Sequence, residues 1–331
     1  MLAPSPAPAP LPFPWKALGL VLVGLALATW ASPQTALLAG IATALLPGDP
    51  LGAWSHRASK WLLQASVVAL GFSLDLKSLL RLGLHGSLFA LATIAGALVL
   101  GLALGRRLGL SQRLSLLIAS GTAICGGSAI AAVSMVIGAS EAEIAISIGT
   151  VFLLNAVALY LFPFVGHQLG LSQTAFGLWA GIAIHDISSV VGAALSYGPQ
   201  ALATATAVKL ARTLWIVPLT LVLALRPSWG GAVEAAAPTA GAPRRATVTI
   251  PWFIGLFLAA SWSRNASPAV AAHAPELAAL AGRVMVLVLF LIGHSLNHAK
   301  LKAVGWRTLG LGLALWSLIS LGTLWMVLAL R

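Results

Sequence analysis

Two clusters of small and polar residues interrupt long apolar stretches of this 331-residue chain. The first runs from Cys125 to Ser128 (CGGS) and the second from His185 to Ser188 (HDIS). A membrane helix that breaks at such residues frees backbone N–H groups, and the positive ends of its half-helices attract anions. We therefore interpret both clusters as substrate-binding breaks, with backbone and hydroxyl donors at Gly126, Gly127, Ser128 and Ser188. The alternative is that these small residues only allow close helix packing.

The two breaks belong to an internal repeat with an offset of 60 residues. SGTAICGGSAIAAVSMVIG at 120–138 aligns with AGIAIHDISSVVGAALSYG at 180–198, and the alignment pairs Ser128 with Ser188. Paired interruptions at corresponding positions indicate a transporter site more strongly than one interruption does. The repetition therefore favours a broken-helix site over simple packing.

Two basic residues lie inside a later apolar stretch, where charge is unfavourable. Lys209 and Arg212 are three residues apart and share one helix face. Each costs about 2.5–3.5 kcal/mol at the centre of a bilayer, so both should face a polar interior. Asp186 is the carboxylate deepest in a span, and a structural ion pair with Asp186 is the alternative role for either cation. Two cations against one acid still leave excess positive charge, which favours an anionic substrate.

His185 and Asp186 are adjacent, and we assign them to ion coupling. A histidine titrates near neutral pH, although a neutral histidine that is hydrogen-bonded within the break fits equally well. Asn155 is a lone polar group in an apolar span and is expected to form an interhelical hydrogen bond. His294 and His298 have the spacing of a helical metal pair, but no carboxylate ligand lies nearby. We therefore expect no metal site and no cofactor.

The composition excludes an ordinary cytosolic enzyme. Hydrophobic residues make up 59% of the chain and charged residues 8%, against about 25% charged residues in soluble domains. The net charge is +12, but apolar runs separate nearly all the basic residues, so we expect no nucleic-acid partner. Cys125 is the single cysteine, which excludes an internal disulfide.

Apolar stretches follow one another almost from end to end. A bilayer core needs about 20 apolar residues per helix. Eleven stretches approach this length: 15–31, 34–47, 60–75, 84–105, 113–138, 141–165, 174–197, 201–226, 249–264, 276–297 and 304–330. The pattern predicts an all-α polytopic membrane protein of about 10–11 transmembrane helices, with internal repeats and two broken helices.

The soluble segments divide the chain into four parts. The Pro-rich, uncharged segment 1–14 predicts a disordered tail, followed by an uncleaved first helix rather than a signal peptide. Residues 15–226 form a first membrane block with both breaks. Residues 227–248, rich in Ala, Gly and Pro, predict a flexible cytoplasmic linker to a second block at 249–331 that packs on the first.

The distribution of basic residues predicts the orientation in the membrane. With eleven spans and the N-terminus inside, twelve Lys and Arg residues fall in cytoplasmic loops and four fall outside. This asymmetry agrees with the positive-inside rule and places the C-terminus outside. The four outer residues are Lys77, Arg81, Arg264 and Arg331.

A second repeat has an offset of 222 residues. GFSLD at 71–75 matches GHSLN at 293–297, and a glycine follows twelve residues after the first glycine in both copies. By counting, the third and tenth spans are inverted relative to each other, whereas the fifth and seventh are parallel. One symmetry operation cannot produce both relations. A re-entrant segment or a miscounted span would reconcile them.

Several motifs resemble a known family: LLQASVVALGFSLDLKSLLRLG, SGTAICGGSAIAA, GIAIHDISSVVGAA, KLARTLW, TIPWF and GHSLNHAKLKAVG. From about Leu51 to Leu330 the chain resembles the YeiH family of bacterial membrane proteins, which are proposed sulfate exporters. More distantly, GFSLD and CGGS are similar to elements of the bile acid:sodium symporter superfamily. That resemblance implies an inner-membrane transporter with a panel and a core of two crossed, broken helices. The YeiH family carries Glu in the second break, where this chain has His185 and the shorter Asp186.

The function expected from these features is secondary transport of a small anion, such as sulfate or an organic sulfonate, across the cytoplasmic membrane. The chain lacks a nucleotide-binding Gly-x-x-x-x-Gly-Lys-[Ser/Thr] loop, so an H⁺ or Na⁺ gradient is expected to supply the energy. One alternative is a cation/proton antiporter that uses Asp186. A less favoured one is an intramembrane enzyme that uses Asp186 and the histidines. The sequence leaves the oligomeric state open, a homodimer included.

Overall fold

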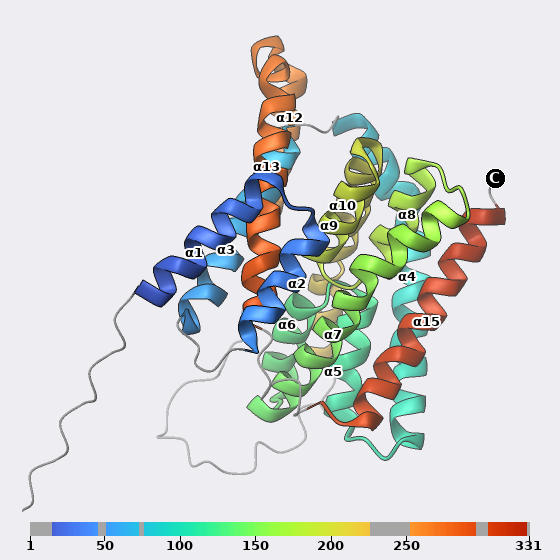
Figure 1. Ribbon diagram of the computed structural model, residues 1–331. Helices are drawn as coiled ribbons and strands as arrows, with labels where there is room; N and C mark the ends of the chain where they lie inside the picture. The colour runs from blue at the N-terminus through green and yellow to red at the C-terminus, as the bar shows by residue number, and fades with distance from the viewer. Residues whose placement is uncertain (1–14, 46–50, 73–75, 226–251, 296–303, 330–331) are drawn as a thin grey trace, which may run out of the picture.

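The computed structural model describes residues 15–45, 51–72, 76–225, 252–295 and 304–329, in which every regular element is an α-helix (Figure 1). The expected all-α polytopic membrane fold is therefore confirmed. The described residues contain five segments long and apolar enough to cross a membrane: Ala90–Arg107, Glu141–Gln168, Pro199–Ala224, Pro268–Ser295 and Trp306–Ala329. The tail at 1–14 and the linker at 227–248 lie outside the described residues.

The helices follow the predicted apolar stretches closely. In chain order they are α1(Trp15–Trp30), α2(Pro33–Ala44), α3(Gly52–Gly71), α4(Leu76–Arg107), α5(Gln112–Ala123), α6(Gly127–Ile137), α7(Glu141–Gln168), α8(Gln173–Ala183), α9(Ile187–Tyr197), α10(Pro199–Thr213), α11(Ile216–Ala224), α12(Trp252–Ala266), α13(Pro268–Ser295) and α15(Trp306–Ala329). The stretches predicted at 113–138 and 174–197 each contain two short helices joined by a break. Both predicted breaks therefore exist.

The first broken stretch, α5–α6, folds back on itself as a hairpin. Ser111, just before α5, donates its hydroxyl to Oε1 of Glu143, in the first turn of α7 after the hairpin, at 2.8 Å. A straight helix over the 32 residues between them would separate them by roughly 48 Å. A Cβ on Gly121 of α5 would lie 2.9 Å from the Ile130 side chain of α6. We call α5–α6 the lower hairpin.

The second broken stretch, α8–α9, forms a matching hairpin. The Tyr197 ring at the end of α9 stacks on the Phe176 ring near the start of α8, with 3.7 Å between centroids. The Tyr197 hydroxyl donates to the Leu171 carbonyl at 2.7 Å. The Gln200 amide donates to Oε1 of Gln173 at 2.9 Å. These contacts close the open end of α8–α9, which we call the upper hairpin.

The two hairpins enter the bundle from opposite faces. The long helix α7 starts at the open end of the lower hairpin and ends at the open end of the upper one (Figure 1). We call these two ends of the bundle the lower face and the upper face. The crossing of two broken helices implied by the more distant resemblance is therefore wrong, because each broken segment returns to the face from which it entered.

Two re-entrant hairpins remove the conflict between the internal repeats. The units α5–α6–α7 and α8–α9–α10 are inverted relative to each other, as the third and tenth predicted spans are. The loops that change sides relative to the predicted eleven-span topology, at 138–141 and 165–174, contain no Lys or Arg. The count of basic residues on each side is thus unchanged, and the orientation stays a prediction.

Helices from both ends of the sequence build the support for the hairpins. A Cβ on Gly40 of α2 would lie 2.1 Å from the Phe290 carbonyl oxygen of α13, and one on Gly293 would lie 2.4 Å from the Leu37 carbonyl oxygen. Helices α2 and α13 are thus in backbone contact, and α13 also packs on α3 and α9. Helix α15 instead packs on α4, α5, α7 and α8. Helices α13 and α15 therefore contact the earlier helices in two separate places.

Candidate functional site at the hairpin tips

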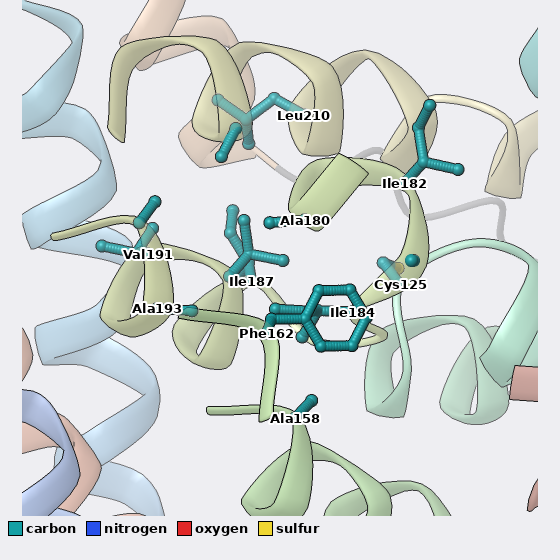
Figure 2. Close-up of a cluster of buried hydrophobic side chains, with 14 of the residues drawn as sticks. Cys125, Ala158, Phe162, Ala180, Ile182, Ile184, Ile187, Val191, Ala193 and Leu210 are labelled. Carbon is teal, nitrogen blue, oxygen red and sulfur yellow. The ribbon is translucent and has the colours of Figure 1, made fainter. Parts of the chain in front are cut away.

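The tips of the two hairpins touch inside the bundle. A Cβ on Gly126 would lie 3.5 Å from Cβ of Asp186 and 3.3 Å from the Val151 side chain. Gly126 also has a φ of +62°, which L side chains rarely adopt. Figure 2 shows the buried apolar residues around this contact, with Cys125 from the lower tip and Ile184 from the upper tip. The turn therefore favours glycine at 126, and an added Cβ would fill the space between the two tips.

Helix α10 holds the lower tip through its two buried cations. Lys209 Nζ donates to the Ile124 carbonyl at 3.3 Å, and Arg212 Nε donates to the Ala123 carbonyl at 2.5 Å. Arg212 Nη1 also donates to the Thr93 hydroxyl at 3.0 Å. These carbonyls form the C-terminal end of α5, where the helix dipole is negative. Both cations thus stabilise the broken end of α5.

Neither cation forms the predicted alternative ion pair. Within the described residues, the one salt bridge joins His273 to Glu276 on the surface, and neither Lys209 nor Arg212 reaches Asp186. Arg212 Nη2 is buried without a partner there. The positive charge at the tips is thus offset by carbonyl oxygens and not by a carboxylate.

Helix α7 holds the upper tip through one amide. Asn155 Oδ1 accepts hydrogen bonds from the backbone N–H of His185 at 3.2 Å and of Asp186 at 3.4 Å. The interhelical role predicted for Asn155 is therefore confirmed, although the sequence did not reveal that its partner is the second break. Asn155 Nδ2 is buried and has no partner in the described structure.

Each hairpin tip is held by the helix that follows the other hairpin. Helix α7 follows the lower hairpin and holds the upper tip, whereas α10 follows the upper hairpin and holds the lower tip. The inverted repeat explains the shared plan. The chemistry differs because the lower tip presents carbonyl oxygens to α10 and the upper tip presents N–H groups to α7.

The N-termini of the two returning helices also differ. Asp186 Oδ2 caps α9 by accepting from the Ser188 amide at 3.0 Å and from the Ser188 hydroxyl at a shorter distance. Helix α6 starts at Gly127 with no side-chain cap, so its first N–H groups lack helical partners. Ser128 is exposed, whereas Ser188 is buried. The uncapped half-helix N-terminus thus belongs to the lower tip.

Four side chains at the tips carry buried nitrogens without acceptors among the described residues. They are Asn155 (Nδ2), His185 (both ring nitrogens), Arg212 (Nη2) and Trp316 of α15 (Nε1). The ring centroids of His185 and Trp316 are 6.4 Å apart. Amide, guanidinium and indole nitrogens can only donate, and imidazole can donate and accept. The site therefore offers unused donors to a ligand with acceptor atoms.

The structure describes one member of the histidine pair considered as a metal site, His294. His294 Nδ1 lies 3.0 Å from the Thr43 hydroxyl, and His298 lies outside the described residues. No group of three or more His, Cys, Asp or Glu in the described part of the chain has the geometry to hold a metal ion.

Comparison with known proteins identifies similar chains along almost the whole length. The family model described as "Conserved hypothetical protein 698" matches residues 17–312. A UPF0324 membrane protein of Porphyromonas gingivalis is 45% identical over 305 residues, covering 91% of this chain and 88% of the relative. UPF0324 membrane proteins of Bacteroides thetaiotaomicron and Geobacter sulfurreducens are 40% and 42% identical, covering 89% and 92% of this chain and 86% and 93% of theirs. No solved structure matches.

Proposed function

The chain belongs to the Conserved hypothetical protein 698 family, the YeiH or UPF0324 membrane proteins, and from that premise we propose that it is a secondary transporter of a small anion. The substrate class is sulfate or an organic sulfonate. Transport crosses the bacterial cytoplasmic membrane and uses an ion gradient, with the N-terminus inside. The protein is multi-pass and acts as a transporter, not as an enzyme.

The contact between the two hairpin tips is the observation that carries this proposal. Non-helical backbone at membrane depth is tolerated where protein buries it or where it lines a polar cavity. Here both tips are non-helical, they touch at Gly126 and Asp186, and they come from opposite faces. Access from either face then leads to one place, as alternating access requires.

The free hydrogen-bonding groups favour an anion over a cation. A cation site requires acceptor oxygens, and three of those at the tips are already engaged: Oδ2 of Asp186 accepts from Ser188, and the Ala123 and Ile124 carbonyls accept from α10. The partnerless groups of Asn155, Arg212 and Trp316 are donors only. An oxyanion satisfies such donors, and a metal cation does not.

The site residues take distinct roles in this proposal. Gly126, Gly127 and Ser128 present the uncapped N-terminus of α6 to the anion, and Lys209 and Arg212 supply positive charge. Ser188 remains a hydroxyl donor whose hydrogen bond to Asp186 must rearrange when it binds substrate. His185 and Asp186 couple the anion to a moving H⁺ or Na⁺.

Flux in liposomes tests the charge assignment. Arg212→Gln removes the charge and keeps an N–H donor, Arg212→Lys keeps the charge, and Arg283→Gln changes an exposed arginine of α13 as the control. We expect anion flux to be lost in Arg212→Gln, partly retained in Arg212→Lys and unchanged in Arg283→Gln. Full flux in Arg212→Gln, at unchanged protein yield, would contradict the assignment.

Binding and ion replacement separate the two transporter hypotheses. A true substrate at 100 times its Kd should stabilise the purified protein by about 2.7 kcal/mol against unfolding. A cation/proton antiporter should show flux that survives replacement of every anion. That flux should stop when Na⁺ is replaced, or when Asp186→Asn is the one change made.

A further inference from the structure

Many buried hydroxyls of the described helices are satisfied by carbonyls of the preceding turn. The hydroxyls of Ser120, Ser147, Thr150 and Thr220 donate to carbonyls three or four residues earlier. Those of Ser320 and Thr323 in α15 are buried and have no partner in the described structure, and the same holds for Trp316 Nε1. Positions 316, 320 and 323 lie on one helix face. They form a buried polar stripe on α15.

The α15 stripe begins at the upper hairpin tip. The Trp316 ring is 6.4 Å from the His185 ring, and Trp179 of α8 donates its Nε1–H to the Ser320 carbonyl at 2.9 Å. Helix α8 descends from the upper face to this tip, and α15 ends at the upper face (Figure 1). From 316 to 323 the stripe therefore rises about 10 Å toward the upper face.

His185 is the titratable group at the deep end of the stripe. Its side chain is fully buried, and both ring nitrogens lack partners in the described structure. Asp186 beside it is engaged by Ser188, and Lys209 and Arg212 of α10 are engaged by carbonyls. The thiol of Cys125 belongs to the facing tip. Of these groups, the imidazole is the one whose titratable atoms are all without hydrogen-bond partners in the described structure, so one ring nitrogen can accept a proton and the other can donate one.

We propose that Trp316, Ser320 and Thr323 line a hydrated path that carries protons between the upper face and His185. Hydroxyl groups donate and accept, so Ser320 and Thr323 can order a chain of water molecules, while the Trp316 indole anchors one. A hydronium ion gives its proton to a free His185 nitrogen and leaves as water. This inference rests on the proposed transport function, because it names His185 as the carrier of the coupling ion.

Thiol labelling tests the path without requiring transport. In oriented proteoliposomes, Thr323→Cys is exposed to a small, charged, thiol-specific reagent added at the upper face. The matched control is Ile319→Cys, a buried apolar position on the same helix, and the wild type with its buried Cys125 gives the background. We expect Thr323→Cys to react at least about tenfold faster than the control. Equal rates would overturn the proposal.

A second experiment tests the coupling. The Ser320→Ala/Thr323→Val variant is compared with Thr308→Val, which removes an α15 hydroxyl already bonded to the Gly305 carbonyl at 2.6 Å. We expect the double variant to retain anion counterflow. The factor by which a pH gradient accelerates its flux should fall about tenfold, because the hydroxyls no longer form hydrogen bonds to the water chain. Thr308→Val should match the wild type in both measurements.

The outcomes separate the path from the transport function. Full pH-gradient acceleration in the double variant, or in His185→Gln, would overturn the proposed path. If the wild type shows no counterflow with sulfate or sulfonates, the proposed function fails, and labelling of Thr323→Cys still decides whether the path exists.

Discussion

Replacing Asn155 with leucine should loosen the upper tip and leave the rest of the bundle intact. Leucine has a similar size but removes the acceptor of two buried N–H groups, those of His185 and Asp186. Leaving a buried donor unsatisfied costs about 1–3 kcal/mol. Because both bonds are long, at 3.2 and 3.4 Å, we expect the low end for each, or about 2 kcal/mol in total. The loss of Nδ2 should cost little, since it has no described partner.

Hydrogen exchange of a peptide that covers 184–188 measures this effect. A local destabilisation of about 2 kcal/mol speeds exchange from the opened tip by roughly 30-fold. The control is Thr150→Val, also in α7, whose hydroxyl bonds the Ile146 carbonyl of the same helix at 2.8 Å. Exchange at 184–188 should be unchanged in the control. An unchanged rate in Asn155→Leu would refute the claim that α7 holds the upper tip.

Three further changes give distinct expected results. Gly126→Ala should destabilise the protein by about 1–3 kcal/mol through backbone strain and lower the flux, because its Cβ would fill the space between Val151 and Asp186. Gly138→Ala has similar strain at φ +61° but open space around it, so thermal unfolding should shift while flux remains. Ser128→Ala should weaken substrate binding several-fold, measured by titration, without a change in melting temperature, since Ser128 is exposed. Loss of flux in Gly138→Ala, or unaltered binding in Ser128→Ala, would argue against these roles.

Hydropathy predicted the helices well and the hairpins not at all. A 26-residue apolar stretch has the same hydropathy whether it crosses the membrane or turns back at its middle, because hydropathy analysis uses only the length and apolar character of the stretch. The loops that the hairpins move to the other side, at 138–141 and 165–174, lack Lys and Arg, so the distribution of charge provided no correction. The mismatch between the two repeats was the remaining sign of a re-entrant segment.

The residue types at the site were predictable, and their partners were not. Lys209 and Arg212 stood out because charge is rare in a span, but the carbonyls they bind come from residues 85 and 89 positions earlier. Such long-range contacts leave no local pattern. Trp316 was missed, although it lies in the middle of its span, unlike tryptophans near predicted span ends such as Trp306.

The order in which the chain is made matters because α7 holds the upper tip and α10 holds the lower tip. Because chains are made from the N-terminus, α7 is already present when the upper hairpin is synthesised, and Asn155 can hold that tip at once. The lower hairpin must wait for α10, more than 80 residues later, before cations reach its open carbonyls. A nascent chain in which α10 has not yet been made carries a lower hairpin whose carbonyls lack their cations. Membrane quality-control proteases would recognise the nascent chain at this stage. Variants of Lys209 or Arg212 should prolong that stage and lower the amount of protein that survives insertion.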